Sequence, residues 1–231
     1  MQFLPIPCDQ CFFLEAFVNG YFYVLTGIDL VVLSFMCILT RLSESLSKKQ
    51  KRGFLLAFAL IAAISGLEMV TLAVDGAPAE LRGVNILSNY LGFGLSPAVP
   101  LCFAYVLDKK SLPRHGFKAA VCCEIGYLLL LALSIPYGAV FYVSADNIYR
   151  RGRYFFAYII LYFASILYLS ASMVITSRAF QNRSRALIYP LMCFLTVVTV
   201  IQVALPDLHV TWMCVTLLSV LYEPRLLGEV R

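Results

Sequence analysis

The sequence predicts an all-α integral membrane protein, a bundle of seven transmembrane helices. Hydrophobic residues make up 61% of the chain and charged residues only 13%, which excludes an ordinary soluble domain. The apolar residues form continuous runs, whereas strands of a membrane β-barrel would alternate apolar and polar residues. A helix needs about 20 mostly apolar residues to cross a bilayer. The predicted spans are residues 18–40, 53–74, 83–107, 119–137, 154–176, 187–205 and 208–222.

Basic residues between the spans predict the orientation, because short cytoplasmic loops are enriched in lysine and arginine. Of the 18 basic residues, four fall on one side of the predicted bundle: Arg82, Arg150, Arg151 and Arg153. The N-terminus is therefore expected outside and the C-terminus inside. Topology and attraction to anionic lipid account for the basic inner loops, so we expect the lipid bilayer and no nucleic acid as a partner.

The spans divide the chain into three parts. Residues 1–17 form an extracytoplasmic segment that lacks the positively charged start of a cleavable signal peptide, so we expect it to remain in the mature protein. Residues 18–222 form the membrane domain, and residues 223–231 begin a cytoplasmic linker. Cys8 and Cys11 stand alone as a CxxC pair, more typical of an incidental or disulfide-linked pair than of a metal site. We expect no metal and no cofactor.

The first two spans each carry an acidic residue. Asp29 lies near the middle of the first span, with Thr26 one turn earlier, and either joins helices by hydrogen bonding or contacts a ligand. The basic segment 41–52 is expected to be a solvated turn. Glu68 lies in the outer half of the second span, one turn after Ser65.

The third span carries a polar stripe that ends at a predicted kink. Steps of three and four residues place five small or polar side chains on one helical face: Asn85, Ser88, Asn89, Gly92 and Ser96. This face either lines a polar cavity or packs closely through small residues and interhelical hydrogen bonds. Pro97 and Pro100 are expected to kink the helix below the stripe.

The connection between the fourth and fifth spans is polar. Residues 139–143 are rich in aromatic and β-branched side chains and are expected to form a short strand. A helical and an extended backbone would both place Asn147 and Arg151 on the same face. We predict that Arg151 is buried and paired with Glu68 or with the anionic group of a ligand.

Polar residues of the spans and of this connection concentrate in the predicted outer half of the bundle. Gln202, at the outer end of the sixth span, is one of them. They predict a ligand-binding pocket formed by Glu68, Asn85, Asn89, Asn147, Tyr149, Arg151 and Gln202.

Residues 138–154 read GAVFYVSADNIYRRGRY. This stretch is similar to the N-x-Y-x-R-G signature of seven-helix membrane input domains at the N-termini of bacterial diguanylate cyclases and of some histidine kinases. Residues 85–97 and 197–212 resemble the third helix of that family and its turn between helices six and seven. The resemblance implies a sensor domain in the bacterial cytoplasmic membrane that passes a signal through its last helix to a cytoplasmic signalling domain.

In that family the signalling domain directly follows helix seven. The sequence reaches Arg231 without a cyclase motif, a phosphoacceptor helix or an ATP-binding segment. We therefore expect either an excised input domain or a protein that acts on a separate partner, as a monomer or a homodimer. The ligand is expected to be a small molecule, with an anionic one favoured.

Two other functions compete with the sensor. A small-solute transporter or channel should carry polar groups to the inner face and broken helices at the midplane, which only Asp29 and the Pro97 to Pro100 kink supply. A retinal protein or a membrane enzyme is disfavoured, because the seventh span has no lysine and His115 and His209 fall in loops on opposite faces. We expect no catalytic residue.

Overall fold

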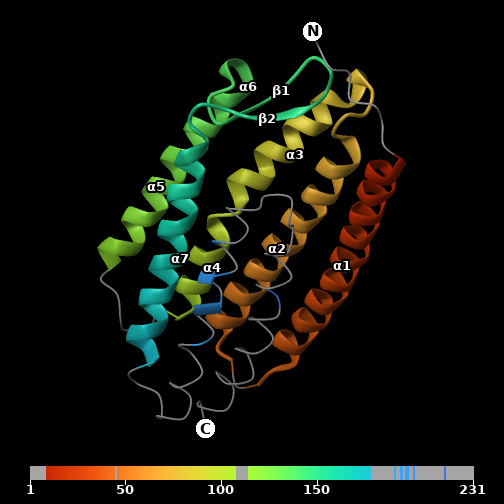
Figure 1. The fold of residues 1–231 in the computed structure, drawn as a ribbon. Helices are drawn as coiled ribbons and strands as arrows, with labels where there is room; N and C mark the ends of the chain where they lie inside the picture. The colour runs from red at the N-terminus through yellow and green to blue at the C-terminus, as the bar shows by residue number, and fades with distance from the viewer. Residues whose placement is uncertain are drawn as a thin grey trace.

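The structure is a computed structural model that describes residues 9–44, 46–107 and 114–177, together with residues 190, 193, 194, 196, 197, 200 and 216. In this part of the chain, five helices are long and apolar enough to cross a membrane. They run side by side, with a short β-hairpin across one end of the bundle, called the hairpin end below (Figure 1). The structure thus shows an all-α multi-pass bundle. The sixth and seventh predicted spans lie mostly outside the described residues, as does Gln202.

Helix α1 (Asp9–Leu42) separates its side chains into two faces. Both sets recur every three or four residues, as expected for a helix with one face against its neighbours and the other against lipid. The buried face comprises Phe22, Thr26, Asp29, Leu33, Met36 and Thr40. The exposed face comprises Tyr21, Val24, Ile28, Val31, Phe35, Ile38 and Leu42. Asp29 therefore points into the bundle.

Helix α2 (Lys48–Val74) begins before the predicted span, so most of the basic segment 41–52 is helical and the prediction of a turn there is wrong. The cause is a capping box, in which the Ser47 hydroxyl accepts from the Gln50 N–H at 3.3 Å and the Gln50 side chain accepts from the Ser47 N–H at 3.1 Å. Lys51 Nζ donates to the Arg41 carbonyl at 3.0 Å, which binds the end of α1 to the start of α2.

The third span is divided, as the prolines predict. A short 3₁₀ helix, η1 (Ala79–Leu81), leads into α3 (Arg82–Leu95), and α4 (Ala98–Leu107) follows. The division falls at Ser96 and Pro97, because proline has no N–H and its ring clashes with the carbonyl four residues earlier. Pro100 lies in the first turn of α4, where helical N–H groups have no intrahelical partner in any case.

The fourth span, α5 (Arg114–Ala132), is followed by the short α6 (Ser134–Tyr137) and the hairpin. Strand β1 (Phe141–Val143) pairs antiparallel with β2 (Tyr149–Arg151), with Phe141 opposite Arg151. The predicted strand within residues 139–143 is confirmed. Helix α7 (Phe155–Ser177), the fifth predicted span, starts directly after the hairpin.

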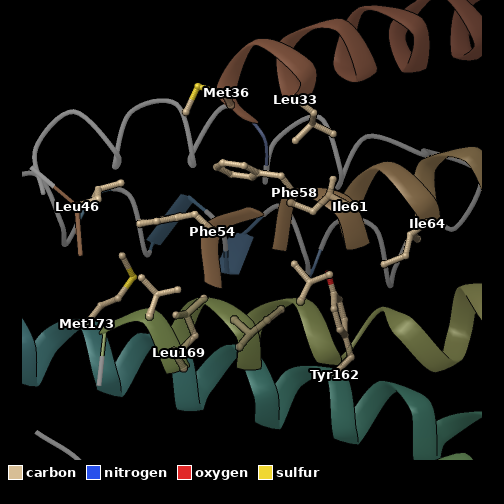
Figure 2. Packing of buried hydrophobic residues seen from close by; sticks show 14 residues of the cluster. Leu33, Met36, Leu46, Phe54, Phe58, Ile61, Ile64, Tyr162, Leu169 and Met173 are labelled. Atoms are coloured by element: carbon tan, nitrogen blue, oxygen red, sulfur yellow. The ribbon is translucent and has the colours of Figure 1, made fainter. Parts of the chain in front are cut away.

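The main apolar core joins four of the helices. It contains side chains from α1, α2, α4 and α7, among them Leu33, Met36, Phe54, Phe58, Ile61, Tyr162, Leu169 and Met173 (Figure 2). The rings of Phe54 and Phe58 both meet Phe103 of α4, at centroid distances of 6.2 and 6.3 Å. Helices α2 and α4 thus form the centre of the described bundle, with α1 against α2 and α7 against α4.

Charged residues differ between the two ends of the bundle. The four arginines predicted to lie outside are all at the hairpin end, beside η1 and the hairpin. The basic residues at the end of α1 and the starts of α2 and α5 lie at the opposite end: Arg41, Lys48, Lys49, Lys51, Arg52, Arg114 and Lys118. This separation agrees with the predicted orientation, and the side of the membrane that each end faces stays a prediction.

Candidate functional site

Three of the predicted site residues meet at the hairpin end. Asn85 and Asn89 come from α3, and Asn147 comes from the turn between β1 and β2. All three are buried, Asn85 and Asn147 completely. A buried amide costs free energy unless it is hydrogen-bonded. The hydrogen-bond partners of these three side chains therefore decide whether they hold helices together or are free to bind a ligand.

Asn147 binds the end of α2 to the hairpin. Its φ of 58° lies in the left-handed region, which asparagine tolerates better than most residues. Its Nδ2 donates to the carbonyl oxygens of Val74 at 2.6 Å and Ala77 at 3.0 Å, and its own carbonyl accepts from the Gly76 N–H at 2.8 Å. The Val74 carbonyl is among those that a helix end leaves without an intrahelical partner. Asn147 therefore caps a helix that ends more than 70 residues earlier.

Asn85 extends this network into α3. Its Nδ2 lies 3.0 Å from Asn147 Oδ1 and 3.0 Å from Asp75 Oδ1. Its Oδ1 accepts from Asn89 Nδ2 at 2.8 Å. Asp75 Oδ1 also accepts from the Tyr149 N–H at 2.7 Å. Asp75 is exposed and Asn85 is buried, so the network runs from the surface into the bundle.

We call Asp75, Asn85, Asn89 and Asn147 the amide joint, because their hydrogen bonds connect α2, α3 and the hairpin. Ser88 adds a second bond between the helices, accepting from the Thr71 hydroxyl at 3.0 Å. The amide nitrogens of the joint are bonded to protein oxygens. Of the two interpretations of the stripe on the third span, this geometry favours hydrogen-bonded helix packing.

Tyr149 connects the amide joint to an aromatic cluster. Its ring stacks on Phe93 at 6.0 Å and on Phe141 at 6.3 Å, measured between ring centroids. Phe93 also meets Phe155 and Tyr158 of α7. Burial raises the pKa of the Tyr149 hydroxyl above its usual value, although Arg151 partly opposes the shift. The phenol is therefore neutral at physiological pH and retains a proton to donate.

Arg151 is exposed, so the prediction that it is buried is wrong. Its guanidinium carbon lies 4.6 Å from the centroid of the Phe155 ring. The prediction that Arg151 and Asn147 point together is also wrong, because the positive φ at Asn147 and the turn closed by the Ser144 N–H and the Ile148 carbonyl, at 2.9 Å, interrupt any regular period. Asn147 faces the end of α2, whereas Arg151 lies at the surface.

Glu68 lies deeper than the amide joint. It is half-buried, six residues before the end of α2 and so about 9 Å along the helix axis. Its carboxylate is close enough to Tyr158 and Tyr162 of α7 to act on both electrostatically. These two rings stack on each other with their centroids 5.8 Å apart. Glu68 is therefore within electrostatic range of α7.

Three residues that shape the site were not predicted from the sequence. Asp75 belongs to the segment Asp-Gly-Ala-Pro, whose composition indicates a turn but not its partners. Arg82 donates from Nη2 and Nε to the Val143 carbonyl, at 2.9 and 3.2 Å. A Cβ on Gly152 would lie 2.5 Å from the Ala139 carbonyl oxygen, so the glycine lets the two backbones approach. Gly152 is the glycine of the N-x-Y-x-R-G signature, so the sequence did contain a reason to select it.

No family model, curated protein or solved structure matches this chain. The resemblance to bacterial input domains stays a prediction, and function is argued below from the geometry. Within the N-x-Y-x-R-G residues, Asn147 and Gly152 hold the local fold. Tyr149 is half-buried and Arg151 exposed, so these two are accessible to a ligand at the hairpin end.

Proposed function

We propose that this protein is a membrane signal-input domain, which binds a small molecule at the hairpin end and relays the event to a cytoplasmic signalling domain or partner protein. The observation that carries the proposal is the amide joint, which ties α2 and α3 to the hairpin. The hairpin in turn leads into α7, and the Tyr154 N–H, next to its start, donates to the Ala139 carbonyl at 2.9 Å. A ligand that shifts the hairpin would therefore move the start of α7.

The charges at the hairpin end favour an anionic ligand. Arg150, Arg151 and Arg153 are all exposed there. A guanidinium group binds a carboxylate or phosphate through two parallel hydrogen bonds. Tyr149, beside Arg151, offers a neutral hydroxyl as an additional donor. We assign the anionic group of the ligand to Arg151 and Tyr149, and we keep Glu68 and Gln202 in the proposal as contacts to the rest of the ligand.

The relay requires two arrangements of the bundle with different affinities for the ligand. A difference of about 1 to 3 kcal/mol is typical of allosteric proteins and changes an equilibrium roughly 5- to 150-fold. The hydrogen bonds of the amide joint are discrete and directional, so they are suited to separate two such arrangements.

A transporter or channel is the second candidate, and the division of the third span favours it. Discontinuous helices near the midplane are typical of secondary transporters. The sensor ranks first because the backbone stays bonded across the division: the Ser96 N–H donates to the Gly92 carbonyl at 3.2 Å, and the Val99 N–H donates to the Ser96 carbonyl at 3.3 Å. The Ser96 carbonyl, at the division, is thus bonded to a protein N–H.

A reporter fusion tests the proposed function. Residues 1–231 would be joined to a diguanylate cyclase domain and screened with small anionic metabolites. Arg151→Ala should raise the half-maximal ligand concentration at least about tenfold, the loss of one charged hydrogen bond. Arg150→Ala is the matched control, since it removes a neighbouring exposed arginine that lies on the opposite face of β2 from Tyr149 and Arg151.

Two results would contradict the proposal. If wild type, Arg151→Ala and Glu68→Gln respond equally to every active compound, the ligand binds elsewhere. If the protein instead carries a solute across the membrane of sealed vesicles, the transporter replaces the sensor.

A further inference from the structure

A second group of polar side chains lies deep in the bundle, away from the amide joint and independent of the proposed function. Asp29 lies on the buried face of α1, and Ser65 is buried on α2, the helix that packs against α1. Thr216, from the seventh predicted span, is the third member. Their side chains are 4%, 2% and 2% exposed, respectively.

The oxygens of this group lie near one another but outside ideal hydrogen-bond geometry. The hydroxyl groups of Ser65 and Thr216 are close enough to the Asp29 carboxyl group to favour its charged form as weak hydrogen-bond donors. Among the described residues, however, none of the four buried oxygens has a partner at the distance and angle of a regular hydrogen bond. The amide joint differs, because its amides are bonded to protein oxygens. An ionised carboxylate without compensation is too costly at this depth, so its charge is either removed by a proton or balanced by a cation.

The geometry favours a cation. A protonated carboxyl group would donate to a neighbouring hydroxyl, and the three side chains would close into hydrogen bonds. Oxygens that each lie about 2.3–2.6 Å from a hard cation stand about 3.3–3.7 Å from one another, at or beyond hydrogen-bond distance. We infer that Asp29, Ser65 and Thr216 form a binding site for an alkali cation, with sodium as the ion. One carboxylate balances one positive charge, whereas calcium sites gather several carboxylates.

Thermal unfolding of the purified full chain in detergent tests the inference. Sodium chloride would be replaced by choline chloride at constant ionic strength. Sodium at roughly 100 times its dissociation constant should raise the Tm of the wild type by about 5–10 °C. Asp29→Asn should abolish this response. Glu124→Gln is the matched control, since it neutralises another buried carboxyl group without a hydrogen-bond partner and should keep the full response.

Two further variants keep the inference testable if Asp29→Asn does not fold. Ser65→Ala and Thr216→Val each remove one neutral oxygen and should raise the half-maximal sodium concentration about tenfold. An unchanged midpoint in both variants would overturn the site. So would equal Tm values of the wild type in sodium, potassium and choline, and a more stable Asp29→Asn would then identify a protonated carboxyl group. This readout does not involve the reporter cyclase, so the inference and the proposed function fail separately.

Discussion

Asn147 combines a left-handed backbone with a completely buried amide. Asn147→Ala should lower the free energy of unfolding by about 3 kcal/mol or more. The substitution removes the side-chain hydrogen bonds to Val74, Ala77 and Asn85, each worth about 1 kcal/mol, and alanine tolerates the left-handed region less well than asparagine does. Asn147→Gly removes the amide but suits the backbone, so it should cost about 1 kcal/mol less than the alanine variant. Thermal unfolding in detergent measures both.

The neighbouring Asp146→Ala serves as the control, because Asp146 is exposed and its loss should change stability by less than about 0.5 kcal/mol. If Asn147→Ala lowered the free energy of unfolding no more than Asp146→Ala does, the hydrogen bonds to the end of α2 would not stabilise the protein.

Gly152 is required for a different reason, the close approach of two backbones. A Cβ there would meet the Ala139 carbonyl oxygen at 2.5 Å, and backbone atoms cannot move aside as a flexible side chain can. Gly152→Ala should therefore destabilise the protein by about 3 kcal/mol or more. Gly92→Ala, in the middle of α3, has no atom within 4 Å of its Cβ and should be neutral or stabilising by up to about 1 kcal/mol. Equal behaviour of the two variants in the same unfolding assay would refute the close approach.

At the residue scale, the group of asparagines could be predicted from the sequence, but not their role in connecting α2, α3 and the hairpin. The spacing on the third span and the signature selected Asn85, Asn89 and Asn147. Their partner Asp75 follows from the path of the chain after α2, which a local pattern does not contain. The burial of Arg151 was mispredicted because Arg151 was expected to share a face with Asn147, whereas Asn147 lies in the hairpin turn and Arg151 in β2.

At the scale of single elements, the start of α2 is set by chemistry that apolar content does not reveal. Ser47→Ala removes the hydroxyl that caps the helix and should cost about 1 kcal/mol. Ser47→Asp should restore most of this loss, since a carboxylate also accepts from the Gln50 N–H. Ser34→Ala is the control, because that exposed hydroxyl only bonds within its own helix, to Leu30. A loss from Ser34→Ala as large as that from Ser47→Ala would contradict the capping role.

Helices α1, α2 and α5 begin before the predicted spans for a physical reason. Apolar runs mark the part of a helix that lies in lipid, whereas the helix itself continues into water as far as its caps permit. Four of the five residues from Lys48 to Arg52 are charged, yet lysine, glutamine and arginine are good helix formers. The S-x-x-Q pattern at Ser47 was readable as a start signal. The division at Pro97 was predicted because proline acts on its own helix, without reference to any neighbour.

For the whole molecule, the prediction concerns orientation. Reporters fused at Lys110 and at Arg231 should both report the cytoplasm, and a reporter at Ala145, in the turn of the hairpin, should report the outside. The reason is the shortage of basic residues at the hairpin end. A cytoplasmic signal from Ala145 would reverse the bundle and with it the proposed side of ligand binding.

The five long helices of the described residues fall on the first five predicted apolar runs, but their arrangement was not predictable from these runs. Lipid tails are as apolar as leucine, so a hydrophobic run carries little information about which helix it packs against. The central position of α4, between α2 and α7, depends on shape complementarity such as that of Phe54, Phe58 and Phe103.

The hydrogen bond from Asn147 to the end of α2 also bears on how the protein is made. The two partners are 73 residues apart, so at about 5–20 residues per second the ribosome needs roughly 4–15 s to supply the second after the first. During that interval the third and fourth spans are made, while Asp75 lacks Tyr149 and Asn85 lacks Asn147 as partners. Insertion of the first spans and locking of their ends are thus separate events in biogenesis. A nascent chain stalled before the hairpin would leave the end of α2 without its cap from Asn147.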